Sequence, residues 1–261
     1  MSIPVVACPR ALLAVVVALA TLACGGDFPS PTQASRSAAL RELSADRPDV
    51  TESPISVDAG HVQIESSLLE WTRDGGSDGV SLLPTNLKLG LSARSDVQFL
   101  FAPQAWENRD GPDGFSDPVV RYKRNLWGND GGKTALGIMP FVKIPGGSDL
   151  STGDPDAGII VPFCVDLTDR AALGLMAEVD WIDAEGLEFL HTASVAIDLG
   201  ADWGMYLEYA GILLEGGYLA MASTGLTYLV NPDLQLDAGL RAGLTGEADD
   251  STLFTGFTIR F

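Results

Sequence analysis

Cysteine, histidine and basic residues are all scarce in this chain of 261 residues. It has 3 cysteines and 2 histidines, and 16 Lys and Arg stand against 35 Asp and Glu, which gives a formal net charge of −19. Nucleic acid is excluded as a partner, because phosphate binding needs a basic surface. The cysteines have neither the spacing of a disulfide framework nor that of a metal site, so we expect no metal and no other cofactor.

The body of the chain also lacks an apolar run long enough for a transmembrane helix. A shorter run of 13 residues, 11–23, is interrupted only by Thr21 and follows the basic Arg10. This pattern is typical of a signal peptide, which we place at residues 1–24. Small-x-small cleavage sites end at Ala20 and Ala23. Alternatively, residues 21–24 resemble a lipobox, in which case Cys24 would be lipidated.

Acidity and hydropathy disagree in this sequence. Apolar residues make up 46% of the chain and the mean hydropathy is +0.18, which excludes disorder for most of it. Residues 25–56 are rich in Ser, Pro and charge, and we interpret them as a periplasmic lead-in that folds into the barrel entrance as a partial plug around residues 47–54. Residues 57–261 have one uniform pattern, which predicts a single domain.

Polarity in that domain alternates with a period of two. Leu234, Leu236 and Ala238 alternate with Gln235 and Asp237, for example, and this period indicates β-strands. Twelve such segments are predicted, at residues 60–71, 84–93, 97–107, 118–127, 134–144, 157–166, 171–181, 188–199, 203–213, 218–229, 233–244 and 251–261.

The connections favour a twelve-stranded antiparallel transmembrane β-barrel of the outer-membrane type. Short turns alternate with connections that include four longer, acidic loops at residues 72–83, 108–117, 145–156 and 245–250, and the chain ends on the aromatic Phe261. The alternative is a soluble β-sandwich or lipocalin-like barrel. Small residues on the polar face, such as Gly90, Gly137 and Gly174, would underfill a packed core, and the strand number exceeds that of a soluble eight-stranded barrel.

Strand parity divides the charges between the lumen and the lipid. A charge facing lipid at the midplane costs roughly 2–4 kcal/mol, so parity should keep charges inside. Glu70 and Arg124 fall on the outward face near strand ends, and Trp71 and Trp106 have inward parity although they lie at the depth of an aromatic belt. Eleven charged residues are predicted to line the lumen: Glu65, Lys88, Arg121, Lys123, Lys143, Glu178, Asp180, Glu208, Asp237, Arg241 and Arg260.

Motifs for catalysis and nucleotide binding are weak. Residues 132–134 begin like the end of a P-loop, but Trp127 stands where that motif needs glycine, and the context is a hairpin. His191 has outward parity near the outer rim, and a lipid hydrolase would use such a histidine with a nearby serine. Since no serine stands two positions from His191 on its strand, no catalytic residues are expected.

Three stretches resemble a known family. Residues 46–54 (DRPDVTESP), 121–132 (RYKRNLWGNDGG) and 138–145 (IMPFVKIP) are similar to a bacterial outer-membrane transporter family labelled for the meta-pathway of phenol degradation. The resemblance covers residues 46–261. It implies an outer-membrane β-barrel that passes small, often aromatic or hydrophobic, compounds, and it implies no catalytic residues.

The sequence thus predicts a channel or transporter in the bacterial outer membrane that works by passive passage. Its expected partners are outer-membrane lipid and lipopolysaccharide, a small-molecule solute, and the barrel-assembly machinery, which would recognise the strand ending in Phe261. A structural or adhesive barrel with a closed lumen is the main alternative, and a lipid hydrolase that uses His191 is a minor one.

Overall fold

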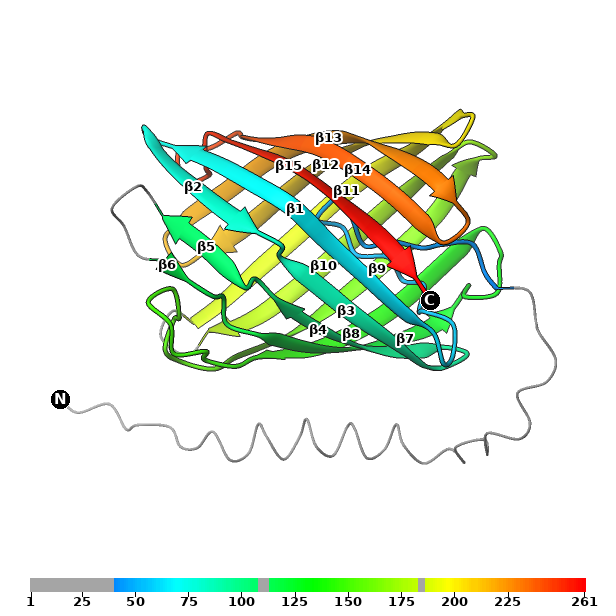
Figure 1. Ribbon diagram of the computed structural model, residues 1–261, viewed down its shortest axis with the longest axis horizontal. Coiled ribbons are helices and arrows are strands. Elements are labelled where there is room, and N and C mark those ends of the chain that lie inside the picture. Colours follow the sequence, from blue (N-terminus) through cyan, green and yellow to red (C-terminus); the bar gives the residue numbers. More distant parts are fainter. Residues whose placement is uncertain (1–39, 108–112, 183–185) are drawn as a thin grey trace. The chain divides into compact units, whose positions relative to one another are not determined.

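Antiparallel strands make up most of the described structure. The computed structural model describes residues 40–107, 113–182 and 186–261, and the unit described below is Arg41–Phe261. Within these residues, 15 strand segments form one sheet (Figure 1). Their bounds are β1 Val62–Asp74, β2 Ser77–Leu82, β3 Thr85–Ser92, β4 Ser95–Phe101, β5 Gln104–Glu107, β6 Asp113–Gly114, β7 Val119–Trp127, β8 Thr134–Lys143, β9 Asp156–Thr168, β10 Ala171–Ile182, β11 Gly186–Gly200, β12 Trp203–Leu214, β13 Gly217–Asn231, β14 Leu234–Gly243 and β15 Ser251–Arg260.

Pairing between the first and last strands closes the sheet into a barrel. β15 pairs with β1 over a register from Gln63↔Arg260 to Arg73↔Ser251, and every other neighbouring pair in the sheet is also antiparallel. Three wall strands are split into two segments each, β2/β3, β4/β5 and β6/β7, so the 15 segments form twelve wall strands. The predicted twelve-stranded antiparallel barrel is confirmed, and its closure leaves no unpaired sheet edge along the seam between β1 and β15.

The three split strands are neighbours, and each is interrupted at a proline. Pro84 lies between β2 and β3, Pro103 between β4 and β5, and Pro118 between β6 and β7. Proline has no backbone N–H to donate to a β-ladder, so the pairing is interrupted there and resumes on the other side. The three interruptions lie side by side in the wall, because the residues next to them are paired across the strands: Thr85 pairs with Phe101, and Leu100 pairs with Val119.

Residues 72–83, expected as a long outer loop, are mostly strand, so that expectation is wrong. β1 continues to Asp74, β2 begins at Ser77, and the two pair directly as a hairpin. Gly75 and Gly76 form the turn with φ angles of 55° and 92°. Glycine reaches this left-handed region without strain, so a two-residue turn suffices and both strands extend through the expected loop.

A β-bulge in β1 and the interruption between β4 and β5 together correct three parity assignments. The register with β15 shifts between Ser67 and Leu69, so Leu68 is an extra residue and the residues after it change faces. Glu70 therefore points inward, where its carboxylate accepts a hydrogen bond of 2.6 Å from Ser67. Trp71 points outward and, through Val80, shares the outer face with Trp106.

Polarity is reversed relative to a soluble protein. In β14, Leu236 is 45% exposed while the neighbouring Asp237 is 5% exposed. Lys88 and Lys123 are among the largest fully buried side chains. An apolar exterior around a polar interior is what a barrel wall in contact with lipid requires, and it contradicts the soluble-barrel alternative.

Among the described residues, no helix is long and apolar enough to cross a membrane.

Candidate functional site

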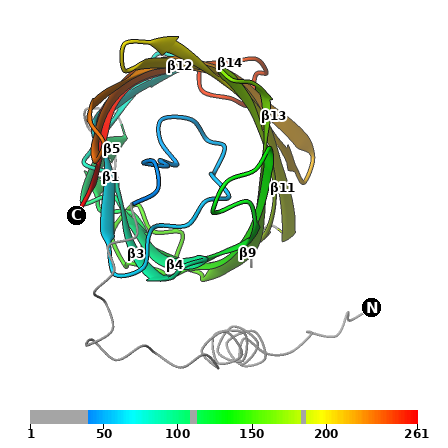
Figure 2. The same ribbon diagram turned by 90° about the vertical axis from the view of Figure 1, so that its right-hand side faces the viewer.

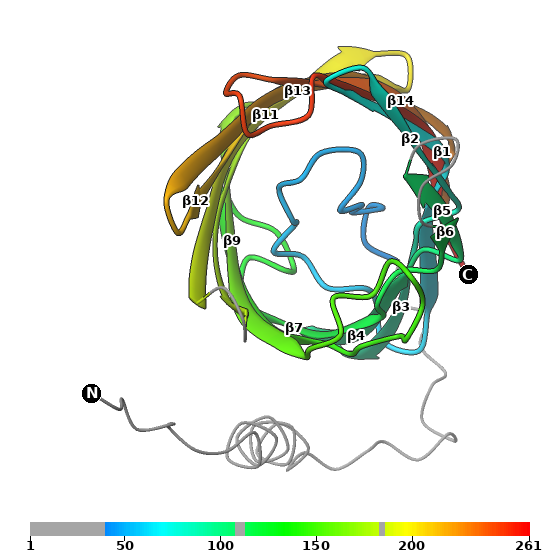
Figure 3. The same ribbon diagram turned by 90° about the vertical axis from the view of Figure 1, so that its left-hand side faces the viewer.

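A stretch of chain that precedes the first strand lies inside the barrel. Residues 41–58, called the inner segment below, form a loop within the ring of strands (Figures 2 and 3). The loop begins and ends near the turns at one end of the barrel, since Arg41 bonds the carbonyl of Ala93 at 3.0 Å and Asp58 pairs with Arg260 at 3.3 Å. It is braced internally by a 2.7 Å hydrogen bond between Ser44 and Ser53.

Asp46 is the centre of a buried ionic cluster. Its carboxylate pairs with Lys123 at 2.9 Å through both oxygens and also with Lys88. Lys88 pairs in addition with Glu65, whose carboxylate accepts the Asp46 backbone N–H at 3.1 Å. Two ammonium groups and two carboxylates thus neutralise one another. Such balance is needed because an unpaired charge in this buried position would be costly.

Arg47, the next residue, connects the inner segment to another part of the wall. Its guanidinium binds both oxygens of Asp237, at 2.7 and 3.2 Å, and donates to the Ser67 hydroxyl at 2.5 Å. A two-point arginine–carboxylate contact fixes orientation as well as position. Asp46 and Arg47 together therefore anchor one turn of the inner segment to β1, β3, β7 and β14.

Glu208 on β12 holds the opposite arm of the inner segment. It accepts hydrogen bonds from the backbone N–H of Val50 at 3.0 Å and of Thr51 at 2.8 Å, and from the Thr51 hydroxyl at 2.7 Å. Ser223 on β13 donates to the same carboxylate at 2.7 Å. The Thr51 and Thr192 hydroxyls form a further hydrogen bond of 2.6 Å. Backbone N–H groups that would otherwise be unsatisfied inside the barrel are thereby paired.

The remainder of the inner segment follows β7 back to the barrel end. Glu52 pairs with Arg121, and the Pro54 carbonyl accepts a 2.9 Å hydrogen bond from Asn125. The Ser56 N–H donates to Asn129 at 2.9 Å, and the Val57 N–H donates to Asp96 at 2.9 Å. Polar wall residues thus satisfy the backbone of this irregular stretch.

One apolar contact completes the packing. Met139, Ile160 and Met176 form a buried cluster on the inner face of β8, β9 and β10, and Val50 of the inner segment packs against it. Phe141 and Leu190 are also part of this contact. The inner segment is therefore held by burial of apolar surface as well as by ion pairs.

Glycines on the inner wall make room for the inner segment. A Cβ at Gly90 would lie 2.0 Å from the Asp58 carbonyl oxygen, and one at Gly256 would lie 2.4 Å from the Arg47 guanidinium. A Cβ would also meet the segment at Gly137 and Gly174, at 3.2 and 3.1 Å. These are among the small residues that would underfill a conventional core, and the inner segment occupies that space.

The other predicted lumen residues lie outside this network or at its edges. Lys143 pairs with Asp156, and the Arg241 guanidinium lies 4.9 Å from the Phe254 ring. Arg260 pairs with Asp233 at 2.7 Å at the barrel end. Glu178 is buried, and one carboxylate oxygen of Asp180 is buried without a hydrogen-bond partner. Cys24, the predicted lipidation site, lies outside the described residues.

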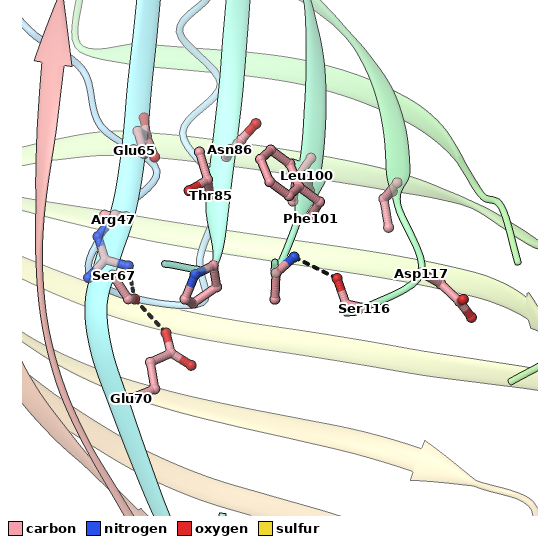
Figure 4. Close-up of a pocket in the computed structure, with 13 residues that line it drawn as sticks. Arg47, Glu65, Ser67, Glu70, Thr85, Asn86, Leu100, Phe101, Ser116 and Asp117 are labelled. Atoms are coloured by element: carbon pink, nitrogen blue, oxygen red, sulfur yellow. Dashed lines mark hydrogen bonds between the residues drawn. The ribbon is translucent and has the colours of Figure 1, made fainter. Parts of the chain in front are cut away.

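A cavity remains beside the inner segment. It has a volume of about 280 Å³ and lies against β1, β3 and β4, next to the interruptions of the wall strands (Figure 4). Ser67, bonded between Arg47 and Glu70, forms part of its wall. Its lining is Arg47, Glu65, Ser67, Glu70, Pro84, Thr85, Asn86, Leu100, Phe101, Ala102, Ser116, Asp117 and Val119.

Two further groups bear on electrostatics and catalysis. In the loop between β14 and β15, burial and the neighbouring Asp74 carboxylate raise the pKa of Asp249, which reflects the crowding of acidic groups there.

His191 lies on the outer face, and its Nε2 lies 3.1 Å from the Tyr218 hydroxyl. The ring partner of this histidine is therefore a tyrosine and not a serine nucleophile.

Sequence reasoning placed most polar wall residues but missed their partners. Lys123, Arg121 and Asp237 pair with the inner segment and not with one another across the lumen. Asp46 and Arg47 were not among the predicted site residues. The signal was present, because a charged, proline-containing stretch preceded a wall with unusually many inward glycines.

Comparisons with known proteins agree with this architecture. A sequence model of the family described as "Putative MetA-pathway of phenol degradation" matches residues 45–261. No curated protein matches the sequence. The NanC porin structure has a TM-score of 0.55 at 10% identity, covering 76% of this chain and 98% of that one. The KdgM porin has a TM-score of 0.52 at 9% identity, covering 77% and 99%.

A third solved structure, described as the CymD monoaromatic hydrocarbon channel, has a TM-score of 0.48 at 12% identity and covers 78% of this chain and 88% of that one. The first two likenesses show that the chain shares its barrel fold with two porins.

Proposed function

This chain belongs to the family described as "Putative MetA-pathway of phenol degradation", and from that membership and the barrel we propose that it is an outer-membrane channel for small solutes. Passage is passive and involves no chemical reaction. The observation that carries the proposal is the reversed polarity of a closed twelve-stranded wall, apolar outside and polar inside. Twelve strands lie between the eight that leave no channel and the sixteen that enclose an aqueous one.

The proposed solute is small and uncharged, and aromatic or hydrophobic in character. The cavity of about 280 Å³ combines apolar lining at Leu100 and Phe101 with hydrogen-bonding groups at Ser67 and Asn86. An engineered cavity of about 150 Å³ holds one benzene molecule, so this one has room for a substituted single ring. The family description, which names phenol degradation, points to the same class.

Liposome swelling with solutes of graded size tests this proposal. Refolded protein should admit neutral single-ring solutes faster than protein-free liposomes do, and it should exclude neutral disaccharides. Rates equal to those of protein-free liposomes for every solute would contradict the proposal.

A closed structural barrel is the second candidate, and the inner segment favours it. Residues 41–58 contact β1, β3, β7, β12 and β14 and so occupy much of the lumen. Planar-bilayer recordings separate the two functions. A closed scaffold gives no current above background, whereas a channel gives discrete openings.

The exterior of the barrel is the proposed contact with membrane lipid and lipopolysaccharide. Leu87 and Leu89 on β3 are each 41% exposed, and Trp181 near the end of β10 is 60% exposed. An apolar band with aromatic residues toward the strand ends is the surface that an outer-membrane barrel presents. Protein extracted from cells should therefore cofractionate with outer-membrane lipid.

A further inference from the structure

Two members of the ionic network also form the wall of the cavity. Arg47 and Glu65 line the cavity, and Arg47 is the one residue of the inner segment among its lining residues. Glu65 accepts the Asp46 backbone N–H and pairs with Lys88, so the turn at residues 46–47 is attached directly to the cavity wall. Movement of this turn would change the cavity more than movement of any other part of the inner segment.

The two arms of the inner segment are held differently. The arm at residues 50–51 is bound through backbone groups to Glu208 and through Val50 to an apolar cluster. The turn at residues 46–47 is held mainly by side-chain charges, which pair with Lys88, Lys123 and Asp237, and by one backbone N–H, that of Asp46, bonded to Glu65. These polar groups can take water as a partner when the turn moves toward the barrel end, whereas the apolar contact of Val50 would be lost on exposure to water.

We propose that the cavity is a solute-binding site on the conduction path and that the turn at residues 46–47 is its gate. The inference rests on the proposed channel function and deepens it. Solute occupies the space between the inner segment and β1, β3 and β4, and displacement of the Asp46–Arg47 turn connects that space to the barrel end where the chain enters. The arm bound to Glu208 stays in place.

The charges around the cavity define the solute that it accepts. Arg47 is neutralised by Asp237, and Glu65 is neutralised by Lys88. Glu70 is bonded to the Ser67 hydroxyl. Asp117 accepts hydrogen bonds from the Gly146 N–H at 2.6 Å and the Thr152 N–H at 3.0 Å. The lining charge that is not balanced by these ion pairs is negative, so the site admits neutral molecules and disfavours anions.

A pair of matched substitutions tests the gate. Asp46→Asn removes the carboxylate that holds Lys88 and Lys123, and Glu42→Gln makes the same acid-to-amide change at an exposed residue four positions earlier in the inner segment. Both variants and the wild type are refolded, checked for heat-modifiable migration on gels, and measured in planar bilayers and in liposome swelling with phenol and with benzoate at pH 7.

If the turn is the gate, Asp46→Asn raises open probability and phenol flux about tenfold over the wild type, because loss of a buried ion pair shifts the closed state toward the open one. Glu42→Gln stays within about twofold of the wild type, and benzoate lags behind phenol in every variant after the rate in protein-free liposomes is subtracted for each solute. Asp237→Asn frees Arg47 without leaving the lysines unpaired, so it should also raise flux. It serves as the test if Asp46→Asn does not refold.

Equal flux in the aspartate variant that refolds and in Glu42→Gln would overturn the gate while the channel function stands. Wild-type protein without phenol flux or current would instead overturn the proposed function itself. A faster flux of benzoate than of phenol would overturn the assignment of the cavity as the binding site.

Discussion

Replacing Glu208 by alanine should release one arm of the inner segment while the barrel stays intact. The Glu208 carboxylate accepts hydrogen bonds from the Val50 N–H, the Thr51 N–H and the Thr51 hydroxyl at 2.7–3.0 Å. A hydrogen bond to a charged group contributes about 1.5–3 kcal/mol to stability. Loss of the two backbone bonds should therefore cost about 3 kcal/mol or more, which corresponds to roughly a hundredfold change in the opening equilibrium of this arm.

Native-state amide hydrogen exchange of the refolded protein measures that change directly. In Glu208→Ala, the protection of the Val50 and Thr51 amides should fall by about two orders of magnitude. Amides in paired strands such as β10 and β11 should keep their protection, since their ladders do not involve the carboxylate.

Ser223→Ala is the matched control. It removes one 2.7 Å hydrogen bond to the same carboxylate but leaves the acceptor of the Val50 and Thr51 amides in place. Protection of those amides should then fall less than tenfold, in keeping with a net value of about 1 kcal/mol for one hydrogen bond. Unchanged protection in Glu208→Ala would refute the view that this carboxylate holds the inner segment.

Three further predictions concern the wall. In Gly90→Ala the new Cβ would lie 2.0 Å from a carbonyl oxygen of the inner segment, so the free energy of unfolding should fall by about 1–3 kcal/mol. Gly246→Ala, with open space around it, should leave the free energy of unfolding unchanged. Deleting Leu68 removes the extra residue but leaves Leu69 paired with Thr255 and Glu70 paired with Phe254, so the Glu70 carboxylate still faces the lumen. The heat-modifiable form on gels should therefore persist in the deletion variant, and its loss would contradict the assignment of Leu68 as the bulge residue. Phe261→Ala should lower the outer-membrane yield in cells but not refolding in detergent. Equal yields in cells would show that the assembly machinery does not read this residue.

The wall of this barrel was readable from sequence because its rule is local. A strand with one face toward lipid and one toward a polar lumen must alternate, so parity alone placed Lys88, Lys123 and Asp237 on the inner face. Parity assigned the wrong face where one extra residue in a strand shifts the alternation. Leu68 adds a residue to β1 and reverses the faces of Glu70 and Trp71, and nothing in the alternation itself marks such a bulge.

The partners in the lumen could not be read in the same way. Arg47 is hydrogen-bonded to Asp237, 190 positions away in the sequence, and Thr51 is hydrogen-bonded to Glu208, 157 positions away. Neither residue type nor period specifies such pairs, because each depends on where the closed wall carries a charge of the opposite sign. The inward glycines were visible in the sequence and residues 47–54 were predicted as a partial plug, but which glycine faces which residue of the inner segment became apparent only with the fold.

The inner segment precedes all of the strands described above, yet its binding site is complete only when β15 is in place. Arg41 accepts a 2.9 Å hydrogen bond from Arg260 across 219 positions, and β15 must pair with β1 before Arg260 is positioned. A contact that closes a loop of that length forms late in assembly, because the entropy lost on closing the loop must first be compensated by other contacts. The segment therefore behaves as an intramolecular ligand of the finished barrel. It binds the closed wall and not the open sheet, and by mass action it opposes reopening of the seam between β1 and β15.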